Sequence, residues 1–179
     1  MFGVKTMDKS KAYKNFIDQF LEANDWPSRK DGCPVELLDK LTENEKQLAE
    51  GELLKRLKPG DDWPVRGLGH IRSKAALPEL KKMLKKTKGS MRACIALAIW
   101  KISKDDSMCD VVLEESHKRY TDNDDSTKTF EMIDIIFFLA EFPMEAARHR
   151  IAELKDSKNY LISYNAQRVP EYWRQYINE

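Results

Sequence analysis

The sequence contains little of what interrupts helices or cross-links a small fold. Of its 179 residues only 7 are Gly, 7 are Pro and 3 are Cys. Scarce Gly and Pro favour helix, because these two residues are the strongest helix breakers. Three separated cysteines, Cys33, Cys94 and Cys109, cannot all pair internally. They exclude a disulfide scaffold, and we expect reduced thiols in a cytoplasmic protein.

The chain also lacks long apolar runs. None approaches the about 20 residues of a membrane span, and the N-terminal stretch has lysines but no apolar signal segment. What the chain does have is 34% charged and 41% hydrophobic residues. That share of apolar residues excludes a disordered chain, and the length suits a single domain over residues 1–179.

Apolar residues recur at intervals of three and four, the helical spacing, and no alternation typical of strands occurs. The predicted fold class is therefore all-α. Thr42 and Glu45 have capping-box spacing, and Gly89 and Ser90 have the positions of a helix stop and the next N-cap. The spacing predicts helices over residues 13–21, 34–41, 42–57, 63–71, 75–86, 91–102, 108–120, 130–142, 145–155, 160–168 and 171–177.

The central part of the chain repeats itself. A shift of 31 places aligns Leu68 with Ile99 and Leu80 with Val111, and the helix breaks at 72–74 and 103–106 also coincide. A third copy fits after a nine-residue insertion, where Leu139 aligns with Ile99. A repeating helix–turn–helix unit is the pattern of stacked helical repeats.

These residues resemble a known family. Gly67-Leu68-Gly69-His70-Ile71, a short turn and Ala76-Leu77-Pro78-Glu79-Leu80 are similar to one HEAT-like repeat of the phycobilin-lyase type, and Met91-Arg92-Ala93-Cys94 to the opening of the next. The likeness is best over 61–115 and weaker over 127–156. It implies a short right-handed α-solenoid (an α-α superhelix) of HEAT-like pairs over 61–156, with atypical capping helices at 1–57 and 157–179. It implies macromolecular binding and no single activity.

Charge is segregated along the chain, although 31 Lys and Arg nearly balance 30 Asp and Glu. Residues 61–104 carry a net charge of +8, whereas residues 105–134 carry −7. Such asymmetry is an argument about partners and association rates. We therefore expect the functional surface in these two segments.

The basic cluster has a helical register as well as a sign. Lys81, Lys82, Lys85 and Lys86 share one helix face, and Lys74, Lys88 and Arg92 extend it. Two interpretations are open: a solvated helix face, or a docking surface for an acidic protein or a phosphate backbone. Lys outnumbers Arg and no exposed aromatic is interleaved, which favours electrostatic steering over base readout.

The acidic stretch contains Asp122, Asp124 and Asp125. It fails as a calcium loop, because Thr127 stands where Gly is needed and Ile133 where Glu is needed. It is interpreted as a solvated loop whose last residues cap the next helix, with an acidic contact for a basic partner as the alternative.

Catalytic and metal patterns are weak. Glu114 and His117 have the Glu-x-x-His spacing of a carboxylate-bridged di-metal site, but the second such motif is missing. Cys94 and Cys109 lie in apolar contexts typical of inert thiols. We expect no metal, no cofactor and no enzyme; a cleft shared by Asp62, Arg66, His70 and Arg92 would revive an enzymatic hypothesis.

The function predicted is a non-catalytic protein-binding module that uses its charge-segregated surface. Adaptor, regulator and toxin-neutralising inhibitor are the roles considered, and a second protein with an acidic patch is the expected partner. The alternative is a nucleic-acid-binding HEAT-like protein, a class that includes enzymes acting on damaged bases. No membrane association is expected, and the oligomeric state is left open.

Overall fold

The computed structural model describes residues 9–120 and 125–177, and these residues contain helices and no strand. The predicted all-α fold is confirmed over this part of the chain. Three short turns accompany the α-helices: a π-helical turn η1 (Ile17–Leu21) and the 3-10 turns η2 (Val35–Leu37) and η3 (Lys74–Ala76). The helices α1 to α10 are, in chain order, Lys11–Phe16, Trp26–Arg29, Glu43–Lys55, Asp62–His70, Leu77–Leu84, Gly89–Ser103, Ser107–Arg119, Ser126–Ala140, Glu145–Leu154 and Tyr160–Ile177.

Local capping fixes several helix starts. At α3, the Thr42 side chain accepts from the Glu45 backbone, and the Glu45 carboxylate accepts from the Thr42 backbone, so the predicted capping box is confirmed. Asp125 caps α8 by accepting a hydrogen bond from the backbone N–H of Lys128 at 3.1 Å. This confirms the predicted capping role for the one residue of the acidic stretch that the structure describes.

Four local predictions are wrong. The helix expected over 34–41 is only the three-residue 3-10 turn η2. The helix expected over 13–21 is α for only its first part and then widens into the π-helical turn η1. Ser90 is not an N-cap, because α6 already begins at Gly89. The two helices expected over 160–168 and 171–177 are one helix, α10. Its backbone continues through position 170, since proline costs one hydrogen bond but has a φ angle that suits a helix.

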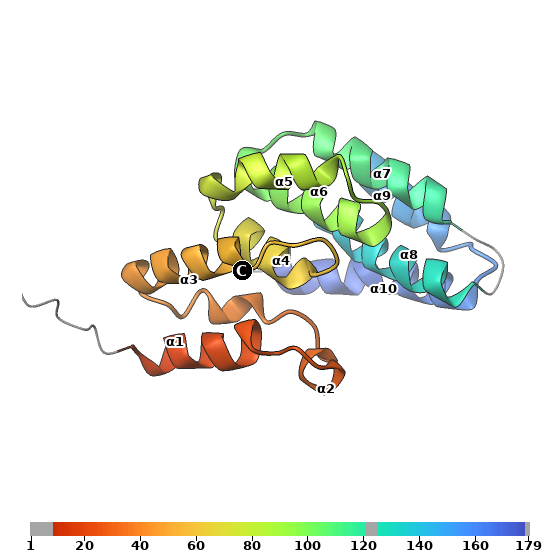
Figure 1. Cartoon of the computed structure of the whole chain (residues 1–179). Coiled ribbons are helices and arrows are strands. Elements are labelled where there is room, and N and C mark those ends of the chain that lie inside the picture. Colours follow the sequence, from red (N-terminus) through yellow and green to blue (C-terminus); the bar gives the residue numbers. More distant parts are fainter. Residues whose placement is uncertain (1–8, 121–124, 178–179) are drawn as a thin grey trace, which may run out of the picture.

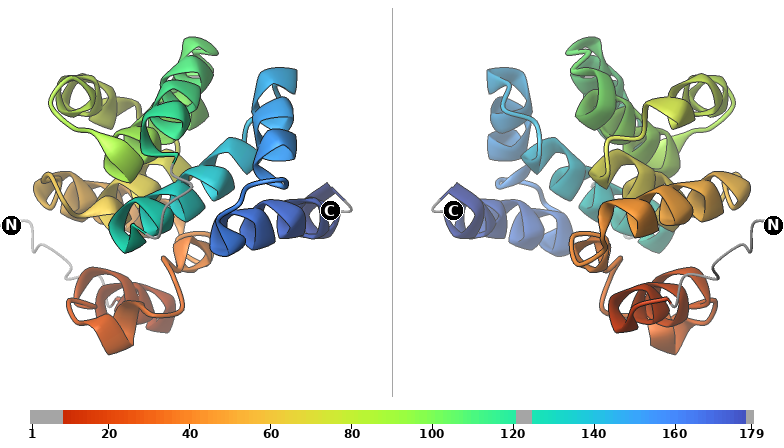
Figure 2. Two further views of the ribbon diagram at one scale, coloured as in Figure 1. Left: turned by 90° about the vertical axis from the view of Figure 1, so that its right-hand side faces the viewer. Right: turned by 90° about the vertical axis from the view of Figure 1, so that its left-hand side faces the viewer.

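The helices from α4 onward form two rows (Figures 1 and 2). Helices α4, α6, α8 and α10 pack one against the next and form the inner row. Helices α5, α7 and α9 splay outward from it. Helix α7 packs on α6 and α8, and α9 packs on α8 and α10, whereas α5 packs on α6. One outer helix therefore follows each of α4, α6 and α8 in the chain.

The N-terminal segment lies on the opposite side of the inner row from α5, α7 and α9 (Figure 2). Helix α3 and the turn η2 pack on α4, and α1 packs on η2. The inner row is consequently covered on both sides near α4.

Within the described residues no helix is long and apolar enough to cross a membrane.

The core centres on α6. Seven consecutive residues of this helix, 93–99, are buried. Gly69 lets α4 approach closely, because a Cβ at this position would lie 2.9 Å from the Cα of Ala98. Because α6 is buried in this way, it fixes the positions of the helices packed on it, α4 and α8 of the inner row among them.

Candidate functional site

A groove of about 440 Å³ opens between the C-terminal end of α5 and the C-terminal half of α7. Five of the nine residues that line it are cationic and two are anionic. No aromatic side chain is among them. The lining consists of Leu84, Lys85, Thr87, Lys88, Arg92, Glu114, Glu115, Lys118 and Arg119.

Two consecutive helix pairs supply the cations. Lys85 follows the end of α5, and Lys88 immediately precedes α6. Arg92 lies one turn into α6, so its side chain reaches across to α7. Lys118 and Arg119 come from the last turn of α7, where cations also interact favourably with the helix dipole. The groove therefore exists only because α5, α6 and α7 are packed together.

The floor of the groove is a buried carboxylate. Glu115 is 2% exposed and accepts hydrogen bonds from the backbone N–H of Gly89 and from Arg92 Nη1, both at 2.7 Å. Gly89 has a φ of +65°, and a Cβ there would come within 2.8 Å of the Glu131 carboxylate. Glu115 thus caps the start of α6 from the next helix, in place of a local side chain.

The rim holds a second, exposed carboxylate. Glu114 accepts hydrogen bonds from Arg92 Nη1 at 2.8 Å and from Lys118 Nζ at 2.5 Å. The hydrogen bond from Lys118, followed by that from Arg92, lowers the pKa of Glu114 to about 2. The bonds to Glu114 and then Glu115 raise the pKa of Arg92. Glu114 is therefore ionised and shared by two cations at neutral pH.

The structure brings together three of the predicted basic residues, Lys85, Lys88 and Arg92. The other lysines of the cluster are exposed: Lys81 and Lys82 on α5, Lys74 in η3 and Lys86 just beyond the end of α5. Lys82 pairs with Glu79 at 3.4 Å. Within the described residues no ion pair involves the following lysines: Lys74, Lys81, Lys85, Lys86 and Lys88.

Of the predicted acidic residues the structure describes only Asp125, which does not line this groove. Asp125 caps α8 and lies 3.6 Å from the ammonium group of Lys128. Asp122 and Asp124 lie outside the described residues. The opposite charges of the two segments meet instead at Arg92, which pairs with Glu114 and Glu115. Part of the segregated charge is therefore neutralised within the protein.

Lys118 and Arg119 were missed by the sequence argument. Both fall in the stretch 105–134, whose net charge of −7 conceals them. The i,i+4 spacing of Glu114 to Lys118 and of Glu115 to Arg119 on one helix was the available indication. The net charge of a segment does not show which of its charged side chains lie on the same face of a helix.

No family model matches the chain, and neither a curated protein nor a solved structure matches it significantly.

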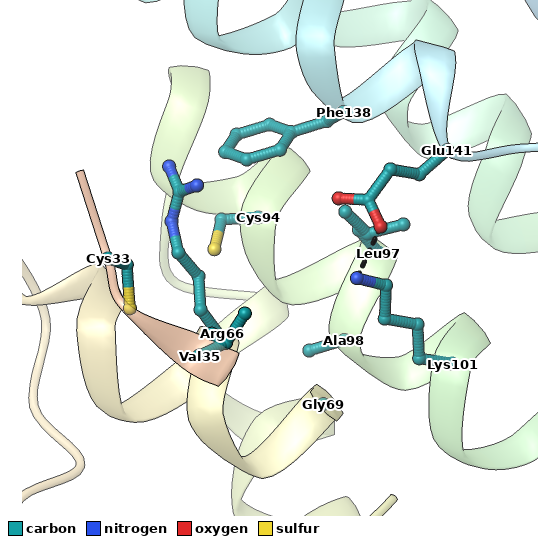
Figure 3. A pocket seen from close by; sticks show the side chains of 10 residues that line it. All are labelled: Cys33, Val35, Arg66, Gly69, Cys94, Leu97, Ala98, Lys101, Phe138 and Glu141. Atoms are coloured by element: carbon teal, nitrogen blue, oxygen red, sulfur yellow. Dashed lines mark ion pairs between the residues drawn. The ribbon is translucent and has the colours of Figure 1, made fainter. Parts of the chain in front are cut away.

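A smaller cavity of about 150 Å³ lies on the other side of α6, between the inner row and the N-terminal segment. Figure 3 shows Arg66 reaching past Cys94 toward the ring of Phe138. The guanidinium carbon is 4.8 Å from the ring centroid, and Arg66 Nε donates to Asp62 at 2.5 Å. Across the cavity, Lys101 and Glu141 form an ion pair. The charges of this cavity are thus matched by partners.

The thiols near this cavity are unreactive by environment. Burial raises the pKa of Cys94 to about 12 and raises that of Cys33 as well. A raised pKa removes the thiolate that nucleophilic chemistry needs. All three cysteines are free in the structure.

The residues that would have revived an enzymatic hypothesis do not share a cleft. Asp62 and Arg66 pair with each other, His70 Nε2 lies 2.8 Å from Asp39 Oδ1, and Arg92 lines the groove. Within the described residues no three His, Cys, Asp or Glu side chains are grouped so that they could hold a metal ion. Glu114, half of the Glu-x-x-His spacing, is engaged by Arg92 and Lys118.

Proposed function

We propose that this protein is a non-catalytic protein-binding module whose groove between α5 and α7 holds an acidic segment of a partner protein. The two rows of helices support the finer architecture proposed with it, a short right-handed α-solenoid of HEAT-like pairs. In such an array each pair contacts only its neighbours, and grooves between pairs are natural docking sites.

The observation that carries the proposal is the surplus of cations in one groove. Of the five basic side chains that line it, Arg92, Lys118 and Arg119 are ion-paired with carboxylates of α7 and α8. Lys85 and Lys88 have no ion pair within the described residues, and the exposed Lys81 continues the positive surface along α5. A surplus of one sign in a concave site raises the local concentration of oppositely charged ligands and speeds association. An acidic peptide segment matches both the sign and the open shape.

Two features favour a protein over a nucleic acid. No aromatic side chain lines the groove, so bases would find no stacking platform there. Glu114 also lies between Arg92 and Lys118, so the groove offers no unbroken line of cations to a continuous phosphate backbone. A short acidic peptide segment is compatible with this pattern, because its negative charges lie at the ends of separate side chains rather than on every unit of the backbone.

A fluorescent Asp- and Glu-rich peptide tests the proposal by anisotropy at low and physiological salt. The double variant Lys85→Glu/Lys88→Glu should bind it at least about tenfold more weakly, because two attractive charges become repulsive. Lys40→Glu/Lys58→Glu is the matched control, with the same change in net charge at exposed lysines outside the groove lining. Its affinity should stay within about twofold of the unchanged protein.

Absence of peptide binding at low salt, or equal losses in both double variants, would refute the groove as the docking site. A parallel mobility-shift series with duplex and single-stranded nucleic acid covers the alternative. Tighter binding of nucleic acid than of the peptide would replace the proposal by that alternative. Capture of the partner from the native source would then distinguish an adaptor, a regulator and a toxin-neutralising inhibitor.

A further inference from the structure

We infer that the groove is built for a phosphorylated Ser or Thr side chain of the partner protein, and that Glu114 occupies the phosphoryl position until the partner binds. The inference rests on the proposed function, because it names the chemistry of the partner segment that the groove accepts.

Glu114 has the position of a displaceable ligand. Its side chain is 48% exposed, and each of its carboxylate oxygens is held by one cation, Arg92 or Lys118. Glu115, directly beside it, is buried and fixed by the start of α6. Glu114 can therefore rotate into solvent, which frees the ammonium group of Lys118 and leaves Arg92 bound to Glu115 alone. Glu115 remains part of the floor.

An exchange of one carboxylate for another would gain little. Glu114 belongs to the same helix as Lys118, and this tethering gives it a high effective concentration near that cation. A single Asp or Glu of a partner offers the same chemistry without the tether. A ligand that displaces Glu114 must therefore bring more charge or more acceptor oxygens.

A phosphate monoester meets this requirement. It carries a charge of about −1.5 to −2 at neutral pH and has three strong acceptor oxygens. Besides Arg92 and Lys118, it finds Lys85 and Lys88 in the same groove, neither of which has an ion pair within the described residues. Charge-assisted hydrogen bonds to several cations at once are the strong form of this interaction.

Space and charge in the groove agree with an ester on a peptide rather than a free ion. The groove has about 440 Å³ and is open along its length, which leaves room for the residues that flank a phosphorylated side chain. The exposed lysines of α5 continue beyond it, where acidic neighbours of the phosphorylated residue would lie. Both features extend the contact past the phosphoryl group.

The test compares one acidic Ser-containing peptide in its unmodified and Ser-phosphorylated forms, measured by titration calorimetry at fixed salt. We expect the phosphorylated form to bind at least about tenfold more tightly, and inorganic phosphate to compete with it. Glu114→Gln should tighten binding of both peptides by about threefold to tenfold, because the internal competitor is gone. Glu145→Gln on α9 is the matched control for the change in net charge. Thermal unfolding confirms that each variant is folded.

The outcomes separate the two proposals. Equal affinity for the two peptide forms, abolished by Lys85→Glu/Lys88→Glu, overturns the phosphoryl inference and leaves the proposed function intact. Equal effects of Glu114→Gln and Glu145→Gln overturn the role of Glu114 as competitor. No binding of either peptide, with or without the charge reversal, overturns the proposed function itself.

Discussion

Two hollows of the molecule, the cavity beside Arg66 and the groove beside Arg92, share α6 but differ in their balance of charge. In the cavity beside Arg66, each cation has an acidic partner, Asp62 for Arg66 and Glu141 for Lys101. In the groove beside Arg92, five cations face two carboxylates. Matched charges on the first side stabilise the packing of helices and leave nothing for a ligand. On the second side Arg92, Lys118 and Arg119 are held by carboxylates of α7 and α8. Lys85 and Lys88 have no ion pair within the described residues, so these two cations stay available to an anion from outside.

The strongest test of the matched side is the reactivity of Cys94. Its pKa, raised by burial from 9.0 to about 12, predicts about a thousandfold less thiolate than in the unfolded chain. We expect alkylation of native Cys94 to be slower than in urea by at least that factor. Peptide mass spectrometry of time points measures it directly. Comparable rates in the two states would show that the cavity is open, contrary to the comparison.

Removal of the buried carboxylate from the floor of the groove should cause the next largest change, a loss of stability. Glu115→Ala should lower the free energy of unfolding by about 3 kcal/mol, because Gly89 N–H and Arg92 lose their buried acceptor. Urea denaturation measures the change, with the exposed neighbour Glu114→Ala as control. Similar small losses for both variants would contradict the division into floor and rim.

The close approach of α4 to α6 at Gly69, beside the cavity, predicts a smaller change in the free energy of unfolding. Gly69→Ala places a Cβ against Ala98 and should cost about 2 kcal/mol, since α4 and α6 must move apart. Gly51→Ala, on α3 with nothing within 4 Å, is the control and should instead stabilise by about 0.5–1 kcal/mol. The two substitutions should change the free energy of unfolding in opposite directions. A change of the same sign for both would contradict the tight packing of α4 on α6.

The smallest effect concerns the rim. The pKa of Glu114 is depressed, so its contribution to stability is fully present above its ordinary pKa of 4.5 and is lost as the pH falls through about 2. The stability difference between the unchanged protein and Glu114→Gln should accordingly vanish over that window. Urea denaturation at a series of pH values measures it. A difference independent of pH would show that the contacts with Arg92 and Lys118 do not involve the ionised carboxylate.

Helices and local caps were accessible from the sequence because they depend on neighbours three or four residues away. Thr42 and Glu45 form their box within one turn, and Asp125 caps α8 in the same way. The exceptions are places where neighbours three or four residues away do not decide the structure. The π-helical turn at Ile17–Leu21 buries Phe20 and Leu21, and α10 continues through position 170 although proline disfavours a helix interior.

The site was accessible only in part. The lysines of α5 share a face by helical register alone, so their placement followed from the sequence. Arg92, by contrast, meets Glu114 and Glu115 across 22 and 23 residues. Nothing local marks Glu115 as buried, since burial of a carboxylate depends on the cations and N–H groups brought to it by the fold. Non-local pairing thus decides which charges stay available to a ligand.

The cap on α6 has a consequence for how the chain assembles. The N–H of Gly89 receives its acceptor from a residue 26 positions further along. As the nascent chain leaves the ribosome, the first turn of α6 stays incomplete until α7 has also emerged and docked. We therefore expect the two helices to form one cooperative unit, whose amide protons exchange with solvent together rather than helix by helix.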